Sequence, residues 1–221
     1  MQVIDILALV SCIALALSGW IYGAKFIRRK KNYLLGLELW VVGFSASNFV
    51  AFIATGSEFN YGISLFLDSF SRSFGMPIIA TLGLMAVTHN YKPSILKDLM
   101  LFAAAFAGTF FVYLSDSFDE PRPYFYVVMW SGYTIYLSYF IVRLMRAGEG
   151  MHALATAVGA AAALAVAIVY DFFPIPGDET HLIFMTWAFI TWSYSAIQLY
   201  YAYGALERAK GVASRSFVPA R

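Results

Sequence analysis

Seven stretches of the chain are almost entirely apolar, and short polar segments separate them. Each stretch is close to the ~20 residues that a helix needs to cross the roughly 30 Å hydrocarbon layer of a bilayer. Backbone groups in lipid must find hydrogen bonds within their own segment, so spans of this length are helices. The predicted spans cover residues 3–24, 33–55, 63–87, 97–115, 123–145, 151–173 and 181–206. The sequence therefore predicts an all-α integral membrane protein, with a single seven-helix domain over residues 1–206 and a basic cytoplasmic tail at 207–221.

Composition indicates the same class. Hydrophobic residues make up 61% of the 221 residues and charged residues only 13%, whereas soluble domains average roughly 45–50% and 25%. A compact domain of this size cannot hide so much apolar surface from water. We therefore exclude a soluble enzyme, a disordered chain and a nucleic-acid-binding module. Cys12 is the single cysteine, which excludes an intramolecular disulfide and any Cys-x-x-Cys site.

The charged residues are divided between the two ends of the predicted spans. The first, third and fifth connections and the tail carry 13 of the 15 lysines and arginines, and an excess of basic residues marks the cytoplasmic side. The other side carries eight of the acids, which are Asp5, Glu58, Asp116, Asp119, Glu120, Asp171, Asp178 and Glu179. This pattern predicts an amino terminus outside and a carboxyl terminus in the cytoplasm.

The first span is expected to be retained. Asp5 precedes its apolar run and the basic cluster follows it, which is the reverse of a secretory signal. The arrangement fits insertion into a bacterial inner (plasma) membrane. Seven spans, with the first and fifth starting on the same side, also permit a parallel 3+1+3 duplication, although residues 17–56 and 130–174 match poorly.

Three charged side chains, Glu38, Asp68 and Arg72, fall inside the predicted spans. A charge in the bilayer costs several kcal/mol unless it pairs or faces water, so each is a candidate functional residue. Asp68 and Arg72 are four residues apart and share one helix face, which also holds Ser71. Pro77 lacks a backbone donor, and it predicts a flexible turn that could act as a hinge. Two interpretations stay open, because the pair either lines a substrate path or locks the third helix to its neighbours.

Glu38 lies about five to seven residues inside the predicted cytoplasmic boundary of the second span. Ser45 and Asn48 continue its face at helical spacing. Glu38 is a candidate inner site for a proton or a cation. Alternatively, its carboxylate reaches Lys31, Arg28 or water at the interface.

The seventh span carries a periodic polar seam. Trp187, Thr191, Tyr194, Gln198 and Tyr201 recur at steps of four and three, so they share one face of a helix. We expect this seam to face the interior, where it either walls a pocket or supplies interhelical hydrogen bonds.

The fifth and sixth spans contrast in side-chain size. The fifth carries Trp130, Tyr133 and Tyr136 deep in its apolar run, where they wall a pocket or simply pack. The sixth is rich in alanine and glycine over residues 153–163. Small residues let backbones approach closely, so this helix is expected to pack centrally or at an interface with a second copy or a partner subunit.

Several chemistries lack the residues that they need. A covalent retinal requires a lysine inside the bundle, but all six lysines lie in loops, at span ends or in the tail. His89, His152 and His181 lie at span ends, which disfavours haem. A His-x-x-x-His zinc pattern, a Gly-x-Ser-x-Gly elbow and a Gly-rich phosphate loop are all missing from the sequence. We therefore expect no enzyme activity, no metal and no cofactor.

The sequence leaves two functions open. The first is a small channel or secondary transporter for an ion or small solute, with a path along the second, third and seventh spans. The path residues would be Glu38, Ser45, Asn48, Asp68, Ser71, Arg72, Thr191, Tyr194 and Gln198. The second is a non-catalytic subunit or receptor-like sensor that binds a partner protein or a lipid. Beyond the lipid bilayer itself, the sequence names neither solute nor partner.

Overall fold

The computed structural model describes residues 3–216, and the side chains of residues 3–211. Within this range the chain is almost wholly helical, and seven helical segments are long and apolar enough to cross a membrane, which confirms the predicted number. The elements are α1 (Val3–Lys25), η1 (Phe26–Lys30), α2 (Tyr33–Thr55), α3 (Glu58–Phe70), η2 (Ser71–Ala80), α4 (Thr81–Thr88), α5 (Ile95–Leu114), η3 (Asp116–Phe118), α6 (Arg122–Arg146), α7 (Gly150–Phe172) and α8 (Leu182–Ser216).

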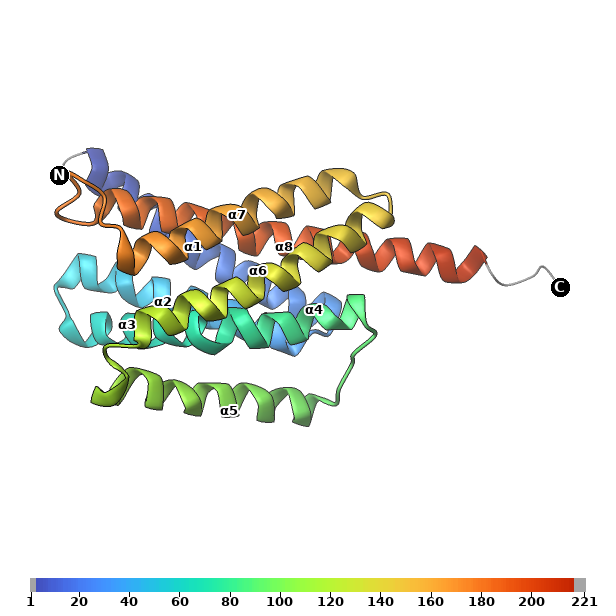
Figure 1. The fold of residues 1–221 in the computed structure, drawn as a ribbon, viewed down its shortest axis with the longest axis horizontal. Helices are drawn as coiled ribbons and strands as arrows, with labels where there is room; N and C mark the ends of the chain where they lie inside the picture. Colours follow the sequence, from blue (N-terminus) through green and yellow to red (C-terminus); the bar gives the residue numbers. More distant parts are fainter. Residues whose placement is uncertain (1–2, 217–221) are drawn as a thin grey trace.

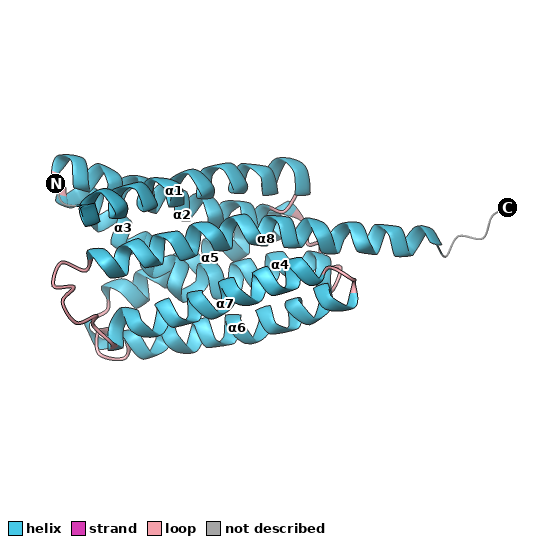
Figure 2. Ribbon diagram, turned by 90° about the horizontal axis from the view of Figure 1, so that it is seen from above, coloured by secondary structure: helices cyan, strands magenta, loops and turns pink. Residues whose placement is uncertain are grey.

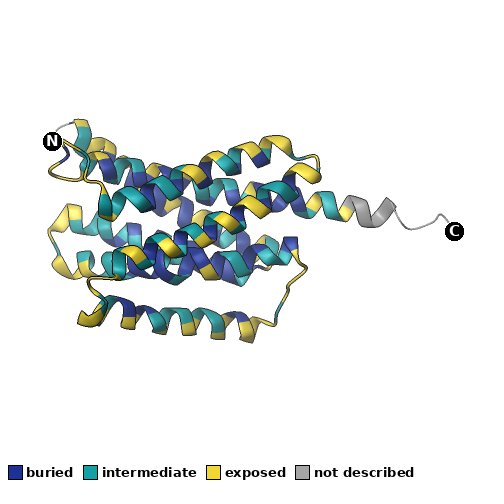
Figure 3. Cartoon of the chain, in the orientation of Figure 1, coloured by how far each residue is buried: buried dark blue, intermediate teal, exposed yellow. Residues whose placement is uncertain are grey.

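The helices run side by side as an elongated bundle (Figure 1). The first span consists of α1 and η1, and the third of α3, η2 and α4. Helix α8 packs against both α1 and α7 (Figure 2), whereas α5 lies at the edge against α3 and η2. Buried positions gather on the sides of the helices that face one another (Figure 3).

The two ends of the bundle differ in charge. We call the end with the α1–α2, α4–α5 and α6–α7 connections the basic end, and the opposite end the acidic end. The basic end carries Lys25, Arg28, Arg29 and Lys30, and the acidic end includes Asp116, Asp119 and Glu120. The orientation of these ends in a membrane, and the 3+1+3 duplication, stay predictions.

Helices α1 and α2 approach closely at a pair of glycines. A Cβ atom added at Gly19 would lie 2.6 Å from the Cα of Gly43 and 2.7 Å from the carbonyl oxygen of Leu39. No side chain fits there without moving backbone, so glycine is what allows this crossing. The following turn is fixed by Asn32, whose side chain accepts a hydrogen bond from the Leu35 N–H at 3.1 Å and caps α2.

The third span departs from α-helical geometry along ten residues, Ser71–Ala80, which form a π-helix. Pro77 lies inside this segment and contributes no N–H to the helix. The loosened turn expected around Pro77 is therefore present. π-Helical turns are rare and are frequently found at functional sites. Whether Pro77 acts as a hinge stays a prediction.

Small residues of α7 pack inside the bundle. Ala153, Gly159, Ala160, Ala163 and Ala167 are among its buried residues, and the helix packs against both α6 and α8. The central packing expected for the sixth span is thus provided by this chain itself. Contact of α7 with another subunit stays a prediction.

Helix α8 is longer than the predicted seventh span. It runs without interruption over 35 residues to Ser216, which corresponds to roughly 52 Å and exceeds the roughly 30 Å hydrocarbon layer. The expected tail at 207–221 is therefore a helical extension as far as Ser216, and residues 217–221 lie outside the described residues. This extension projects beyond the other helices at the basic end (Figure 1).

Candidate functional site

The bundle contains a cavity of about 100 Å³. Side chains from α1, α2, α3, η2, α6, α7 and α8 line it, whereas α5 contributes none of the described lining residues. Along α7 the lining runs from Thr156 to Tyr170, a rise of about 21 Å. The lining residues therefore extend over about 21 Å along the bundle axis, and most of the lining is apolar.

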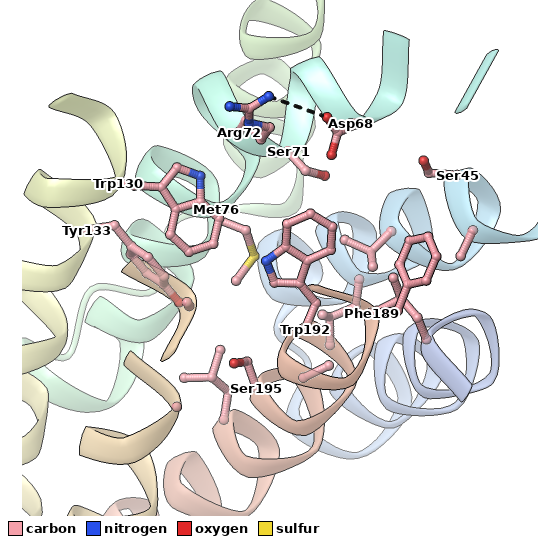
Figure 4. Close-up of a pocket in the computed structure, with 18 of the residues that line it drawn as sticks. Ser45, Asp68, Ser71, Arg72, Met76, Trp130, Tyr133, Phe189, Trp192 and Ser195 are labelled. Atoms are coloured by element: carbon pink, nitrogen blue, oxygen red, sulfur yellow. Dashed lines mark ion pairs between the residues drawn. The ribbon is translucent and has the colours of Figure 1, made fainter. Parts of the chain in front are cut away.

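A buried arginine between two carboxylates lies at one end of the cavity. The Arg72 side chain is only 5% exposed, and its Nη1 lies 3.8 Å from Asp68 Oδ2 while its Nη2 donates to Asp171 Oδ2. Asp68 and Arg72 line the cavity (Figure 4). One cation faces two acids, so the cluster carries one excess negative charge when both acids are ionised.

Two tyrosine rings cover the faces of the Arg72 guanidinium. Its Cζ lies 4.1 Å from the ring centroid of Tyr126 and 3.9 Å from that of Tyr170. The Tyr126 hydroxyl is hydrogen-bonded to the Ser69 hydroxyl at 2.6 Å. The Tyr170 ring meets Phe184 edge to face at 5.2 Å. These rings stabilise the cation through their π faces.

Sequence reasoning missed the role of Asp171. The sequence pattern groups Asp171 with the acids of the outer side. In the structure Asp171 lies near the end of α7, and its carboxylate binds Arg72, which is 99 positions earlier in the chain. The Asp171 side chain is 17% exposed. One feature of the sequence could have indicated this role. Asp171 follows Tyr170 at the end of an apolar span, a position from which a carboxylate can reach into the bundle. The interpretation of Arg72 and Asp68 as an isolated pair is corrected to a three-residue cluster.

Glu38 is fully buried and faces the third span. Its carboxylate occupies the space left by Gly75, because a Cβ at position 75 would overlap it. The Ser71 hydroxyl approaches the carboxylate, but within the described part of the chain no hydrogen bond of ordinary geometry reaches either oxygen. The alternative that Glu38 reaches Lys31, Arg28 or interfacial water is therefore wrong.

The structure brings together only some of the predicted site residues. Of the proposed path and pocket residues, those that line the cavity are Ser45, Asp68, Ser71, Arg72, Trp130, Tyr133 and Gln198. The predicted residues outside the lining are Glu38, Asn48, Tyr136, Trp187, Thr191, Tyr194 and Tyr201. Asn48 donates to the Phe44 carbonyl of its own helix at 2.9 Å. The Tyr136 hydroxyl is hydrogen-bonded to that of Thr88 at 2.8 Å.

The expectation that the α8 seam faces the interior is wrong for two of its members. Tyr194 is 38% exposed and Tyr201 is 47% exposed. The Tyr194 hydroxyl donates to the Ala155 carbonyl at 2.8 Å, and Gln198 donates to the His152 carbonyl at 3.2 Å. The middle of the seam thus binds α7. The physical reason is that tyrosine can turn its hydroxyl to a backbone acceptor while its ring stays at the surface.

No protein-family model, curated protein or solved structure matches this chain significantly. The assignment of function therefore depends on the geometry of the cavity and of the helices around it.

Proposed function

We propose that the protein is a receptor-like sensor, which binds a small, largely apolar molecule inside the bundle and signals through α8. The observation that carries this proposal is that one uninterrupted helix both lines the cavity and projects beyond the bundle. A helix is stiff along its axis, so a shift near the cavity is transmitted to its far end. Shifts of about 1–2 Å are typical of helices in switching proteins.

The cavity lining favours an apolar molecule over a hydrated ion. Phe49, Met76, Phe189 and Trp192 belong to its wall, and an ion that loses its water needs polar ligands in their place. The charged cluster cannot readily serve as an open ion site, because Arg72 is already held by two carboxylates and two rings.

The extension of α8 is placed to report on the cavity. Near the basic end, Lys30 Nζ lies 2.5 Å from Glu207 Oε2, and Lys210 Nζ lies 3.4 Å from Asn90 Oδ1. These contacts join the extension to η1 and to the α4–α5 connection. A shift of α8 would change them, and a partner protein at this end could read the change. With the predicted orientation, the readout would be cytoplasmic.

Distance measurements between spin labels test this proposal. In a Cys12→Ser background, spin labels at Lys97→Cys and Arg208→Cys report the distance between α5 and the extension of α8. Helix α5 serves as the reference because none of its described residues lines the cavity. Saturating 4-fluoroacetophenone or 1-ethyl-4-fluorobenzene, in nanodiscs, is expected to move the mean distance by about 1–2 Å. The same protein with Ala163→Leu, which fills part of the cavity, is expected to show no change. An unchanged distance with probe bound contradicts the proposal.

A second candidate, a secondary transporter, is favoured by two observations. The lining of the cavity extends along the bundle axis, and it includes the π-helix η2, which could open by changing its turns. In this case Glu38, without a cationic partner among the described residues, would be the proton site. Proteoliposomes with a trapped pH-sensitive dye test it, because addition of 4-fluoroacetophenone would then move protons in wild type and not in Glu38→Gln. Equal signals from the two proteins exclude this role of Glu38.

A further inference from the structure

Five buried hydrogen-bond donors of the cavity lining have no acceptor of ordinary geometry in the described part of the chain. One of them, the Ser71 hydroxyl, lies toward the Glu38 carboxylate. The other four lie on α6 and α8. They are the indole nitrogens of Trp130 and Trp192, the hydroxyl of Tyr133 and the hydroxyl of Ser195, and each of these atoms is buried without a partner in the described part of the chain. All four residues belong to the cavity lining. Trp130 is 3% exposed and Tyr133 is 2% exposed, so neither side chain can bond to bulk solvent.

The four donors come from two helices that face each other across the cavity. Trp130 and Tyr133 lie on α6, and their rings meet edge to face at 5.7 Å. Trp192 and Ser195 lie three residues apart on α8 and so share one face of that helix. Figure 4 shows the indole nitrogen of Trp192 beside Met76 and that of Trp130 on the side of its ring toward Arg72, with Tyr133 and Ser195 below them.

The chemistry of these groups defines what would satisfy them. An indole N–H can only donate a hydrogen bond, so its partner must be an acceptor. Buried donors in native proteins are nearly always paired, and an unpaired one indicates a missing partner. A carboxylate ligand is disfavoured as that partner, because the cluster of Arg72, Asp68 and Asp171 already has an excess of acids. The buried Glu38 carboxylate, which lies against η2 without a cationic partner among the described residues, adds a further acid nearby.

We propose that the cavity binds a molecule with an uncharged carbonyl oxygen on a small apolar body. This inference rests on the proposed ligand-binding function. The carbonyl accepts hydrogen bonds from donors of this set on α6 and α8. The apolar body lies against Met76, Phe189 and the alanines of α7. A carbonyl group has two lone pairs and can accept from two donors at once.

Two sources supply this chemistry. The carbonyl belongs either to the acyl ester of a membrane lipid or to a free ketone-like or quinone-like molecule. Nanodiscs of ether-linked phospholipids contain no ester carbonyl, whereas nanodiscs of ester-linked phospholipids do. Comparison of the two therefore separates the sources.

A matched pair of probes tests the inference. 4-Fluoroacetophenone and 1-ethyl-4-fluorobenzene have nearly the same shape, and only the first has a carbonyl. Binding to the full chain in ether-lipid nanodiscs is followed by fluorine NMR, with empty nanodiscs as the reference for partition into lipid. We expect the ketone to bind about tenfold more tightly than the hydrocarbon, because one or two net hydrogen bonds are worth about that factor. Isotope-edited infrared spectra are expected to show a lower carbonyl stretching frequency for the bound ketone.

Single substitutions identify the donors. Tyr133→Phe and Trp130→Phe are each expected to weaken ketone binding about fivefold to tenfold and to leave hydrocarbon binding unchanged. Tyr136→Phe is the matched control, because the Tyr136 hydroxyl is bonded to Thr88 and lies outside the cavity lining. It is expected to leave the binding of both probes unchanged. Thermal unfolding of each variant verifies that it is folded, and Trp192→Phe replaces any variant that is not.

The outcomes are distinct from those of the sensor experiment. Weaker ketone binding in ester-lipid nanodiscs assigns the natural ligand to a lipid ester, and equal binding assigns it to a free molecule. Equal affinity for ketone and hydrocarbon overturns the inference, as does ketone binding that is insensitive to Tyr133→Phe, since water alone then satisfies the donors. Either result leaves the sensor function standing if α8 still moves. Donor-dependent ketone binding with a stationary α8 supports the inference and removes the sensor function.

Discussion

Arg72 and Asp171 form an ion pair between residues 99 positions apart, and this contact joins the third and sixth spans of the bundle. The cation belongs to a π-helical segment, and the acid is the next-to-last residue of α7. Arg72 lines one end of the cavity, and Asp171 binds it from outside the lining. The pair therefore combines a structural contact between distant helices with a boundary of the proposed binding site.

Asp171→Asn is expected to destabilise the protein markedly. Asp68 still balances the charge of Arg72 in this variant, so the loss is that of one buried, charge-assisted hydrogen bond, which is worth about 1.5–3 kcal/mol. Because the Asp171 side chain is 17% exposed, we expect the lower end of this range. The midpoint of thermal or denaturant unfolding in detergent measures the effect.

Asp119→Asn is the matched control, because it breaks another arginine–aspartate pair. Asp119 binds Arg122 near the acidic end, and its side chain is 64% exposed. Exposed ion pairs contribute about 0–1 kcal/mol. Equal losses for the two variants would contradict a special role for the Arg72 cluster.

Arg72→Lys, although it keeps the charge, is expected to lose much of the stability of the cluster. The flat guanidinium packs against two rings and lies next to two carboxylates, whereas an ammonium group cannot stack in this way. We expect a loss of about 2 kcal/mol, since a desolvated cation–π contact alone is worth about that much. Arg143→Lys is the control, because Arg143 contacts Tyr139 at the surface only. A midpoint of unfolding that matches wild type for Arg72→Lys would show that charge alone suffices.

The sequence was sufficient to predict the spans because membrane crossing imposes length and hydropathy on each helix separately. It could not place Asp171, since nothing local to α7 records that Arg72 lies opposite. Charge pairing between spans depends on which helices are neighbours in the bundle, and the composition of each span does not determine its neighbours. Glu38 shows the same limit, because its burial follows from the glycine that faces it on η2.

The seam of α8 illustrates a different limit. Helical periodicity correctly places Tyr194 and Gln198 on one face, since both donate to α7. It does not say whether that face meets a cavity or a neighbouring backbone. Interhelical hydrogen bonds of this kind average only about 0.6 kcal/mol in membrane proteins, so such a seam has little influence on where the cavity forms.

Gly19→Ala is expected to weaken the contact between α1 and α2. The added Cβ would meet backbone atoms of α2 at 2.5 to 2.7 Å, and a backbone cannot yield as a flexible side chain can. Overpacking costs about 1–3 kcal/mol, and we expect the upper part of this range. Gly132→Ala is the control, because nothing lies within 4 Å of its added Cβ. Equal unfolding midpoints for the two variants would show that α1 and α2 can move apart without a loss of stability.

Gly75→Ala tests whether the space beside η2 is reserved for the Glu38 carboxylate. The new methyl group would overlap that carboxylate, so we expect a loss of about 1–3 kcal/mol from overpacking. Combination with Glu38→Ala removes the overlapping atoms, and the double variant should be more stable than the sum of the two single losses predicts. Gly62→Ala in the same span, where nothing lies within 4 Å of the added Cβ, should instead combine additively with Glu38→Ala. Additive losses for Gly75→Ala and Glu38→Ala would mean that the two residues do not share this space, and Glu38 would then lose its assigned position against the π-helix.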